Sequence, residues 1–453
     1  MFLMKKIKNA KSKKIKLRKN LNADALFRSV KEQFNGIADH RTSGAEISLA
    51  DALMSGFAVF SLKDPSLLAF EQRRIAGDSN LNSIFNINTI PSDTRMREIL
   101  DEVEPGSLRP SFTFIFRELQ RGKALEPMVF MNGCYLLSLD GTGYYSSEKI
   151  GSESCMEKKH KKSGKTTFYR QMLGAAIIHP EFKEVIPLAP EMIIKQDGET
   201  KNDCERNAAK RFFSDLRREH PHLPLIVTED GLSSNAPHIK NLRENDLHYI
   251  LGVKPGDHGF LFQYVNAAAA QGSRVVAYAC PDKENPRIRH EFRFINGVPL
   301  NQSNQDLLVN FVEYWESTPQ GRKHFSWITD FTITKDNACQ IMRGGRARWK
   351  IENETFNTLK NQGYNFGHNY GLGKKHLSTV FVQLMMLAFL VDQAQQLVCK
   401  LFKAAWKKCG SKRELWEHAR SLFKNFRLGS MQELYRAILH GYEKQRPVII
   451  GSG

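Results

Sequence analysis

Two aspartates stand where apolar runs end, and glycine follows each of them. Asp140 closes the apolar stretch of PMVFMNGCYLLSLDGTG (127–143), and Asp230 closes LPLIVTEDG (223–231). We expect both runs to be strands, so that the two carboxylates emerge at strand ends into a crevice. The neighbouring glycines leave room for a bulky ligand. Taken singly, each aspartate is more often a turn or cap residue than a metal ligand.

A third acid, Glu352, lies in RARWKIENETFNTLK (346–360), which reads as one helix. Arg348 precedes it by four residues and shares its face. Ile351, Phe356 and Leu359 form an apolar side that we expect to face the core. The pair can be an ordinary intrahelical salt bridge, which contributes only about 0.3–0.5 kcal/mol. Alternatively, Glu352 completes a cluster with the two aspartates.

Three carboxylates in one place repel one another, and without a counter-charge some stay protonated. Divalent cations remove this conflict, and Mg²⁺ and Mn²⁺ prefer oxygen ligands. Two such ions about 4 Å apart can activate a hydroxyl nucleophile and stabilise the leaving oxygen of a phosphodiester. Asp140, Asp230 and Glu352 together therefore predict a two-metal site that cuts and joins DNA.

The overall charge agrees with a nucleic-acid partner. The chain has 453 residues, a net charge of +18 and a sequence pI of about 9.5, with 41% hydrophobic residues as in globular proteins. Such a basic surface attracts polyanions. The first twenty residues hold nine Lys or Arg and no acid. This tail either follows DNA phosphates or is a solvated extension, and the sequence favours neither.

The cysteines and the apolar runs suggest a cytosolic protein. Seven scattered cysteines form no CxxC pair, which is typical of a reduced, cytosolic protein without a disulfide framework. The longest apolar run, VFVQLMMLAFLV (380–391), contains a glutamine and is too short to span a bilayer. We therefore expect no membrane contact.

The predicted elements describe a mixed α/β protein. Residues 22–126 look helical, with caps at Ser48 and at Ser92 or Asp93, and alternating strands and helices follow from 127. Residues 259–322 look like a β-rich insertion with a hairpin turn at Asn296-Gly297. A long apolar helix over 376–402 belongs in the core, and 403–453 is a helical, basic C-terminal region.

The segments LDGTG, VTEDG and RARWKIENETFNTLK together resemble the DDE transposases of bacterial insertion sequences. They are most similar to the branch with a Y-R-E-K signature and a β-rich insertion before the third acid. The likeness spans about 45–400, and its most specific part is RWKIE. The gaps also fit, with 90 residues from Asp140 to Asp230 and 122 from there to Glu352.

The resemblance implies an RNase H-like core, in two parts at 127–258 and 323–402, with the insertion at 259–322 between them. It also implies that the helical region at 22–126 is a DNA-binding domain. The flexible basic tail at 1–21 and the helical C-terminal region at 403–453 follow from the sequence itself. The expected activity is cleavage of the element's ends and attack of the freed 3′ hydroxyl on target DNA. The expected protein is a dimer on paired ends in the bacterial cytoplasm, associated with the nucleoid.

The resemblance further assigns roles at the site. Asp140, Asp230 and Glu352 become the catalytic triad that binds two Mg²⁺ or Mn²⁺ ions, and Arg348 contacts a phosphate near the cut. Trp327 lies 25 residues before Glu352, where relatives have a tryptophan that stacks on a flipped base. An equally good alternative is that Trp327 is a core residue at a strand end.

This chain departs from the signature at two positions. Gly345 stands where the tyrosine is expected, and Leu359 stands where the lysine is expected. Either Lys360 binds the DNA phosphate from a shifted position, or this contact comes from another residue. Glu354 competes for the role of third acid because it lies six residues before Lys360. It is off the Arg348 face, so we favour Glu352.

Two other functions stay open. One is a nuclease of the same fold that cuts without joining, such as a junction resolvase. The other is a DNA-binding protein derived from a transposase, whose acids no longer hold metal.

Overall fold

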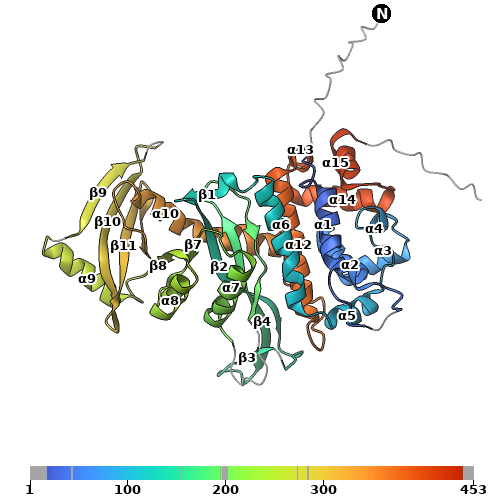
Figure 1. Cartoon of the computed structure of the whole chain (residues 1–453), viewed down its shortest axis with the longest axis horizontal. Helices are drawn as coiled ribbons and strands as arrows, with labels where there is room; N and C mark the ends of the chain where they lie inside the picture. Colours follow the sequence, from blue (N-terminus) through green and yellow to red (C-terminus); the bar gives the residue numbers. More distant parts are fainter. Residues whose placement is uncertain are drawn as a thin grey trace, which may run out of the picture.

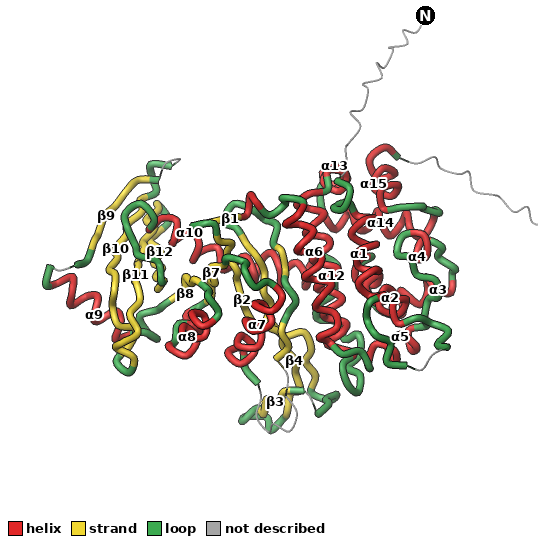
Figure 2. The backbone as a smooth tube through the Cα atoms, viewed as in Figure 1, coloured by secondary structure: helices red, strands yellow, loops and turns green. Residues whose placement is uncertain are grey.

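The computed structural model describes residues 18–41, 44–153, 155–193, 195, 203–272, 274–282 and 285–441. Most of the basic tail predicted at 1–21, and the end of the C-terminal region, lie outside these residues. The described chain is a mixed α/β fold with one large sheet and many helices, as the sequence predicts (Figures 1 and 2). In Figure 1 the sheet runs from the left edge to the centre, and a helical bundle fills the right side.

The described strands form one sheet with the order β3-β4-β2-β7-β8-β12-β11-β10-β9. At its centre β2 (Cys134–Ser147) pairs with β4 (Thr166–Ile178) in antiparallel fashion and with β7 (Leu225–Glu229) in parallel. β8 (His248–Gly252) continues the parallel part, and β3 (Met156–Lys159) lies at one edge beside β4. Three short strands also join the sheet, namely β1 (Val129–Met131), β5 (Ile186–Pro187) and β6 (Glu191–Ile193).

The predicted end of the first strand is wrong. β2 continues to Ser147, and Asp140 lies in its middle, opposite Gly174 of β4. The antiparallel partner β4 extends as far as β2 does, and its pairing carries the strand past Asp140. The prediction for Asp230 is confirmed, because it directly follows β7.

The predicted β-rich insertion does not stand apart from the core sheet. After α9 (Gly259–Ala270), four antiparallel strands extend the same sheet from β8. They are β9 (Val276–Pro281), β10 (Arg289–Asn301), β11 (Asn304–Thr318) and β12 (Gly321–Thr329).

The hairpin turn predicted at Asn296-Gly297 is also wrong. The pairing of β10 with β11 shifts register there and resumes at Val298, so the pair forms a bulge, and the turn lies between Asn301 and Asn304. Gly297 takes a positive φ of 68°, and the Asn296 side chain bonds both backbone groups of Ile333 at 2.9 Å. The bulge therefore ties this strand to the loop after β12.

The helices on the right of Figure 1 form one bundle around α12 (Leu377–Val398), which the N-terminal and C-terminal helices both pack against. α12 is long and apolar enough to cross a membrane by length and composition, but its apolar 18-residue window is entirely buried inside the protein. The caps predicted at Ser48 and Ser92 both accept backbone N–H groups of their helices. The other helices of the bundle are α1 (Ala23–Asn35), α2 (Leu49–Ser61), α3 (Leu67–Ile75), α4 (Asn80–Ser83), α5 (Asp93–Asp101), α6 (Arg109–Arg121), α13 (Lys400–Cys409), α14 (Lys412–Asn425) and α15 (Met431–His440).

Two groups of helices cover opposite faces of the central strands. Neighbouring residues of a strand point to opposite faces. On one face, the Glu205 carboxyl of α7 (Glu205–Glu219) lies over Gly141. On the other face, Phe356 lies over Gly174, the partner of Asp140. Phe356 belongs to a continuous helical run made of α10 (Ala338–Arg346), a tight turn (Ala347–Trp349), a wider π-helical segment (Ile351–Phe356) and α11 (Asn357–Asn361).

Candidate active site

Asp140 points to the face of β2 that carries the helical run. The Ser138 hydroxyl, two residues earlier on the same face, donates to the Arg348 carbonyl at 3.2 Å and ties the run to the strand. One Asp140 oxygen accepts the Gly141 N–H at 3.0 Å, and the other lies 3.6 Å from Arg348 Nη1. Phe356 packs on Gly174 beside it. These contacts fix the carboxyl at the junction of sheet and helix.

The pKa of Asp140 is raised to about 7, mainly because burial disfavours the charged form. The Arg348 guanidinium lowers this pKa, while the carboxylates of Glu352 and Glu205 raise it further. At neutral pH Asp140 therefore holds a proton about half of the time. Burial is the main cause, and the nearby negative charges of Glu352 and Glu205 add to it.

Asp230 comes to the same part of the sheet by strand register. β2 and β7 pair in parallel with a constant offset of 90 residues, ending at Ser138 and Thr228. Asp140 and Asp230 are each two residues beyond that last pair, so they follow it side by side. Asp230 begins a short turn, and its side chain accepts the Leu232 N–H at 3.0 Å.

Glu352 lies on the helical run, as predicted. Its carboxylate accepts from Arg348 Nη2 at 2.8 Å, and its side chain is 48% exposed. Ile351, Phe356 and Leu359 on the other side of the run are all buried, as expected. Arg348 thus contacts both Asp140 and Glu352, and it is the group that joins these two acids.

The competing acid Glu354 faces other partners. Burial lowers the pKa of Lys350 and that of Lys412 on α14, and the negative charge of Glu354 opposes this shift at both lysines. It is not among the charges that act on Asp140. The geometry therefore favours Glu352 over Glu354 as the acid that approaches Asp140.

A fourth acid, Glu205, was missed by the sequence analysis. It is the first residue of α7, and a Cβ added to Gly141 would lie only 2.0 Å from its Oε1 atom. Partial loss of water raises the pKa of Glu205, and the charges of Asp230 and Glu229 raise it further. The signal that could have revealed it is an acid opening the helix that leads into β7.

A cleft of about 560 Å³ opens beside Asp230 and Arg348. Two tryptophans line it in different ways. Trp327 is only 5% exposed, and its indole fills the space beside Gly345, where the signature tyrosine is absent. Trp349 is 45% exposed. The burial of Trp327 therefore agrees with the alternative that it is a core residue. Trp349 is the tryptophan that the cleft exposes to solvent.

Lys360 lies apart from this cleft. It is exposed at the end of the helical run on α11 and lines a different pocket, together with Arg413 and Arg420 of α14.

The oxygen donors of the three predicted acids suit Mg²⁺ or Mn²⁺, but they do not converge fully. Among the residues that the structure describes, no three Asp, Glu, His or Cys side chains are arranged to hold a metal ion. Asp140 and Glu352 meet through Arg348. A shared ion would require Glu352 to turn away from Arg348, and its exposed position on the helix leaves space for this.

Comparison with known proteins adds a structural likeness. No family model matches the chain, and no curated protein matches it. The chain is similar to a piggyBac transposase solved as a synaptic complex with hairpin DNA, with 12% identity and a TM-score of 0.40. The match covers 95% of this chain and 87% of that one. At this level the two architectures agree only in part.

Proposed function

We propose that the chain is a DDE transposase of a bacterial insertion sequence, of the branch with a Y-R-E-K signature. It would bind the ends of its element, cleave them and join the 3′ hydroxyl to target DNA by two-metal-ion phosphoryl transfer. Two observations support the proposal: Arg348 pairs with both Asp140 and Glu352, and Asp230 directly follows β7, which pairs in parallel with the strand that carries Asp140.

In this proposal Asp140, Asp230 and Glu352 hold the metal ions. Bound Mg²⁺ or Mn²⁺ supplies the activation of the attacking oxygen and stabilises the leaving oxygen. Arg348 neutralises Asp140 and Glu352 in the free protein and contacts a DNA phosphate in the complex. The exposed ring of Trp349 in the same cleft offers a surface for base stacking.

The wider proposal follows the resemblance. In this proposal residues 127–258 and 323–402 form the RNase H-like core, which includes strands β3, β4, β2, β7 and β8. The protein acts as a dimer on paired ends in the cytoplasm, associated with the nucleoid. Its net charge of +18 supports DNA as the partner.

A second candidate is a DNA-binding protein derived from a transposase. The ion pairs of Arg348 with Asp140 and Glu352 favour it, because they neutralise the acids without metal. A nuclease that cuts without joining is the third candidate.

The test is to incubate the purified protein with Mg²⁺ and the inverted repeats that flank its coding region. Cleavage with strand transfer supports the transposase, cleavage alone supports the nuclease, and binding alone supports the DNA-binding protein. We expect Asp140→Ala to lower the cleavage rate at least about a thousandfold, since metal-bound carboxylates carry the transition-state stabilisation, while DNA binding persists. Retained cleavage would exclude Asp140 from the site.

A further inference from the structure

A pocket next to the end of the helical run is rich in cations. It has a volume of about 370 Å³ and lies where α11 meets α14. Its lining includes Lys63, Lys360, Arg413, Trp416, Glu417 and Arg420. This pocket shares no residue with the cleft beside Asp230.

Arg420 is half-buried in this pocket without a carboxylate bound to its guanidinium. Within the described residues its one hydrogen bond runs from Nη1 to the Lys63 carbonyl at 3.4 Å. Burial lowers the pKa of Arg420, as do the charges of Arg73 and Arg413, against the attraction of Asp64 and Glu417. A partly desolvated cation of this kind gains from an anion that can accept several hydrogen bonds.

The other charged groups of the pocket differ in how far they are neutralised. Lys63 is fully buried on Asp392, 2.5 Å away, and lies between two aromatic rings. Arg413 pairs with Glu417 at 3.0 Å. Lys360 is exposed and forms no ion pair within the part of the chain that the structure describes. Lys360 and Arg420 are therefore the two cations that stay available to a ligand.

The pocket lies at a definite distance from the acids. Lys360 follows Glu352 by eight residues on one helical run, which corresponds to about 12 Å along the axis. Phosphates of one DNA strand advance about 3.4 Å along the duplex axis per nucleotide. The separation therefore corresponds to three or four nucleotides.

The basic surface continues beyond the pocket. Arg420 also lines a neighbouring pocket, together with Lys424 and Arg427. Arg413, Arg420 and Lys424 are spaced by seven and four residues, so they lie along one side of the helix. An extended polyanion fits this row better than a small anion does.

We propose that Lys360 and Arg420 bind one backbone phosphate of the DNA strand held at the acidic site, three or four nucleotides from the cut, and that the strand continues along α14. This inference rests on the proposed function for the DNA itself. Lys360 is already expected to contact DNA from the resemblance; the new element is Arg420 and the path of the strand along α14. The guanidinium donates in-plane hydrogen bonds to the phosphate, and the lysine adds a second positive charge.

The test measures the affinity for a fluorescently labelled 30-base-pair duplex, by anisotropy, over a series of salt concentrations. We expect Lys360→Ala and Arg420→Ala each to weaken binding about five- to tenfold. The double variant should lower the slope of log affinity against log salt by about one, as the loss of one phosphate contact predicts. Arg420→Lys should recover part of the affinity, because it keeps the charge but not the planar fork.

Two controls separate DNA contact from general charge and from folding. Arg436→Ala removes one exposed positive charge from α15 and should change the affinity less than twofold. Arg420→Ala should leave the melting temperature unchanged, because Arg420 has no carboxylate partner to lose. A drop in melting temperature that explains the lost binding would make Arg420 a structural residue and overturn the inference.

The remaining outcomes distinguish the two proposals. If the wild-type protein binds DNA and the Lys360 and Arg420 variants bind it equally well, the inference is wrong and the proposed function stands. If Arg436→Ala weakens binding as much as Arg420→Ala does, the pocket has no special role, and the inference is again wrong. A wild-type protein that does not bind DNA contradicts the proposed function and this inference together.

Discussion

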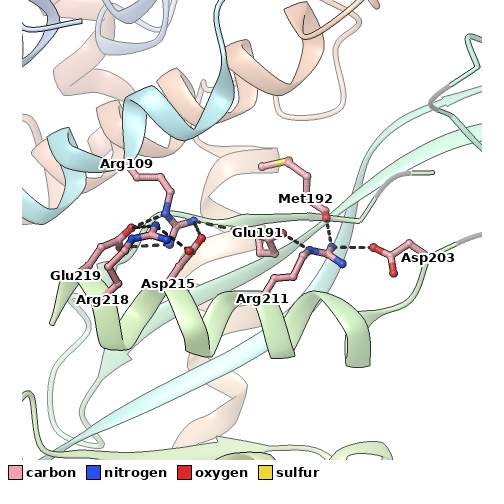
Figure 3. Close-up of polar contacts among 8 residues, drawn as sticks. All are labelled: Arg109, Glu191, Met192, Asp203, Arg211, Asp215, Arg218 and Glu219. Carbon is pink, nitrogen blue, oxygen red and sulfur yellow. Dashed lines mark hydrogen bonds and ion pairs between the residues drawn. The ribbon is translucent and has the colours of Figure 1, made fainter. Parts of the chain in front are cut away.

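Helix α7 borders two acidic clusters that differ in how many of their carboxylates are paired with arginine. Along its buried side, every carboxylate has an arginine (Figure 3). Arg109 contacts Glu219 at 2.5 Å and Asp215 at 3.3 Å, and Arg211 contacts Glu191 at 2.6 Å and Asp203 at 2.8 Å. We call these seven residues the paired network, including Arg218, which contacts Asp215 at 2.7 Å.

At the first residue of the same helix the balance reverses. Asp140, Asp230, Glu205 and Glu352 act on one another in pairs here, and we call them the acidic edge: the charges of Glu352 and Glu205 raise the pKa of Asp140, and the charge of Asp230 raises that of Glu205. Within the described residues Arg348 is the cation that pairs with members of this group, and it contacts two of the four. In the paired network the opposite charges balance, and their ion pairs attach α7 to the sheet and to α6. At the acidic edge negative charge is in excess, so this cluster can bind a cation.

The largest expected effect is at the centre of the paired network. Arg109→Met leaves Glu219, Asp215 and Glu191 without their shared guanidinium, and Arg109 is only 7% exposed. We expect a loss of about 3–5 kcal/mol in the free energy of unfolding, measured by urea titration. The matched change at the acidic edge, Asp140→Asn, should not destabilise the metal-free protein. Equal losses in both variants would show that the two clusters do not differ.

The same substitution of glutamate by glutamine can be made in each cluster, at Glu219 and at Glu205 of α7. Glu219→Gln removes a charge from Arg109 and should cost about 2 kcal/mol of unfolding free energy, since hydrogen bonds to charged groups contribute that much. Glu205→Gln removes a repelling charge near Asp140 and Asp230. Because solvent screens this exposed group, we expect a gain of only about 0.5 kcal/mol without divalent cations. A loss at position 205 would mean that Glu205 has a stabilising partner.

Lowering the pH should reduce the stability of the protein through His220, which lies at the end of α7 beside the paired network. Burial, together with the charges of Arg117, Arg109 and Arg217, lowers its pKa from 6.5 to about 4. Between these values the unfolded chain binds a proton that the folded protein does not, so stability falls as the pH drops. At pH 5.5 the cost is about 1 kcal/mol.

The measurement is a set of urea titrations at pH 7.5 and pH 5.5 on wild type and His220→Gln. The variant should lack this part of the pH dependence. The raised pKa of Asp140 acts in the opposite sense, since its contribution to stability is lost as the pH rises toward 7. An unchanged pH profile in His220→Gln would contradict the account of this histidine.

Local sequence signals predicted the parts of the fold that depend on local physics. Asp230 was correctly predicted to follow a strand because LPLIV is short and apolar, and the turn begins at once. The Arg348–Glu352 pair follows from helical spacing alone. The caps at Ser48 and Ser92 are also local, and both were found.

The wrong predictions concern contacts between distant residues. β2 passes Asp140 because β4 pairs with it from Leu136 to Ser147. Asn296-Gly297 is a bulge rather than a turn because Asn296 bonds to Ile333, 37 residues away. Glu205 reaches the acidic edge because Gly141, far earlier in the chain, has no side chain. None of these contacts leaves a pattern in the spacing of neighbouring residues.

The most direct test of the central claim is the crystal structure of the protein soaked in Mn²⁺, with anomalous scattering used to locate the ions. The account predicts anomalous peaks within about 2.3 Å of carboxylate oxygens of Asp140 and Asp230, with Glu352 turned from Arg348 toward the metal. Peaks elsewhere, or no peak at the acidic edge while Arg348 keeps its two ion pairs, would contradict it.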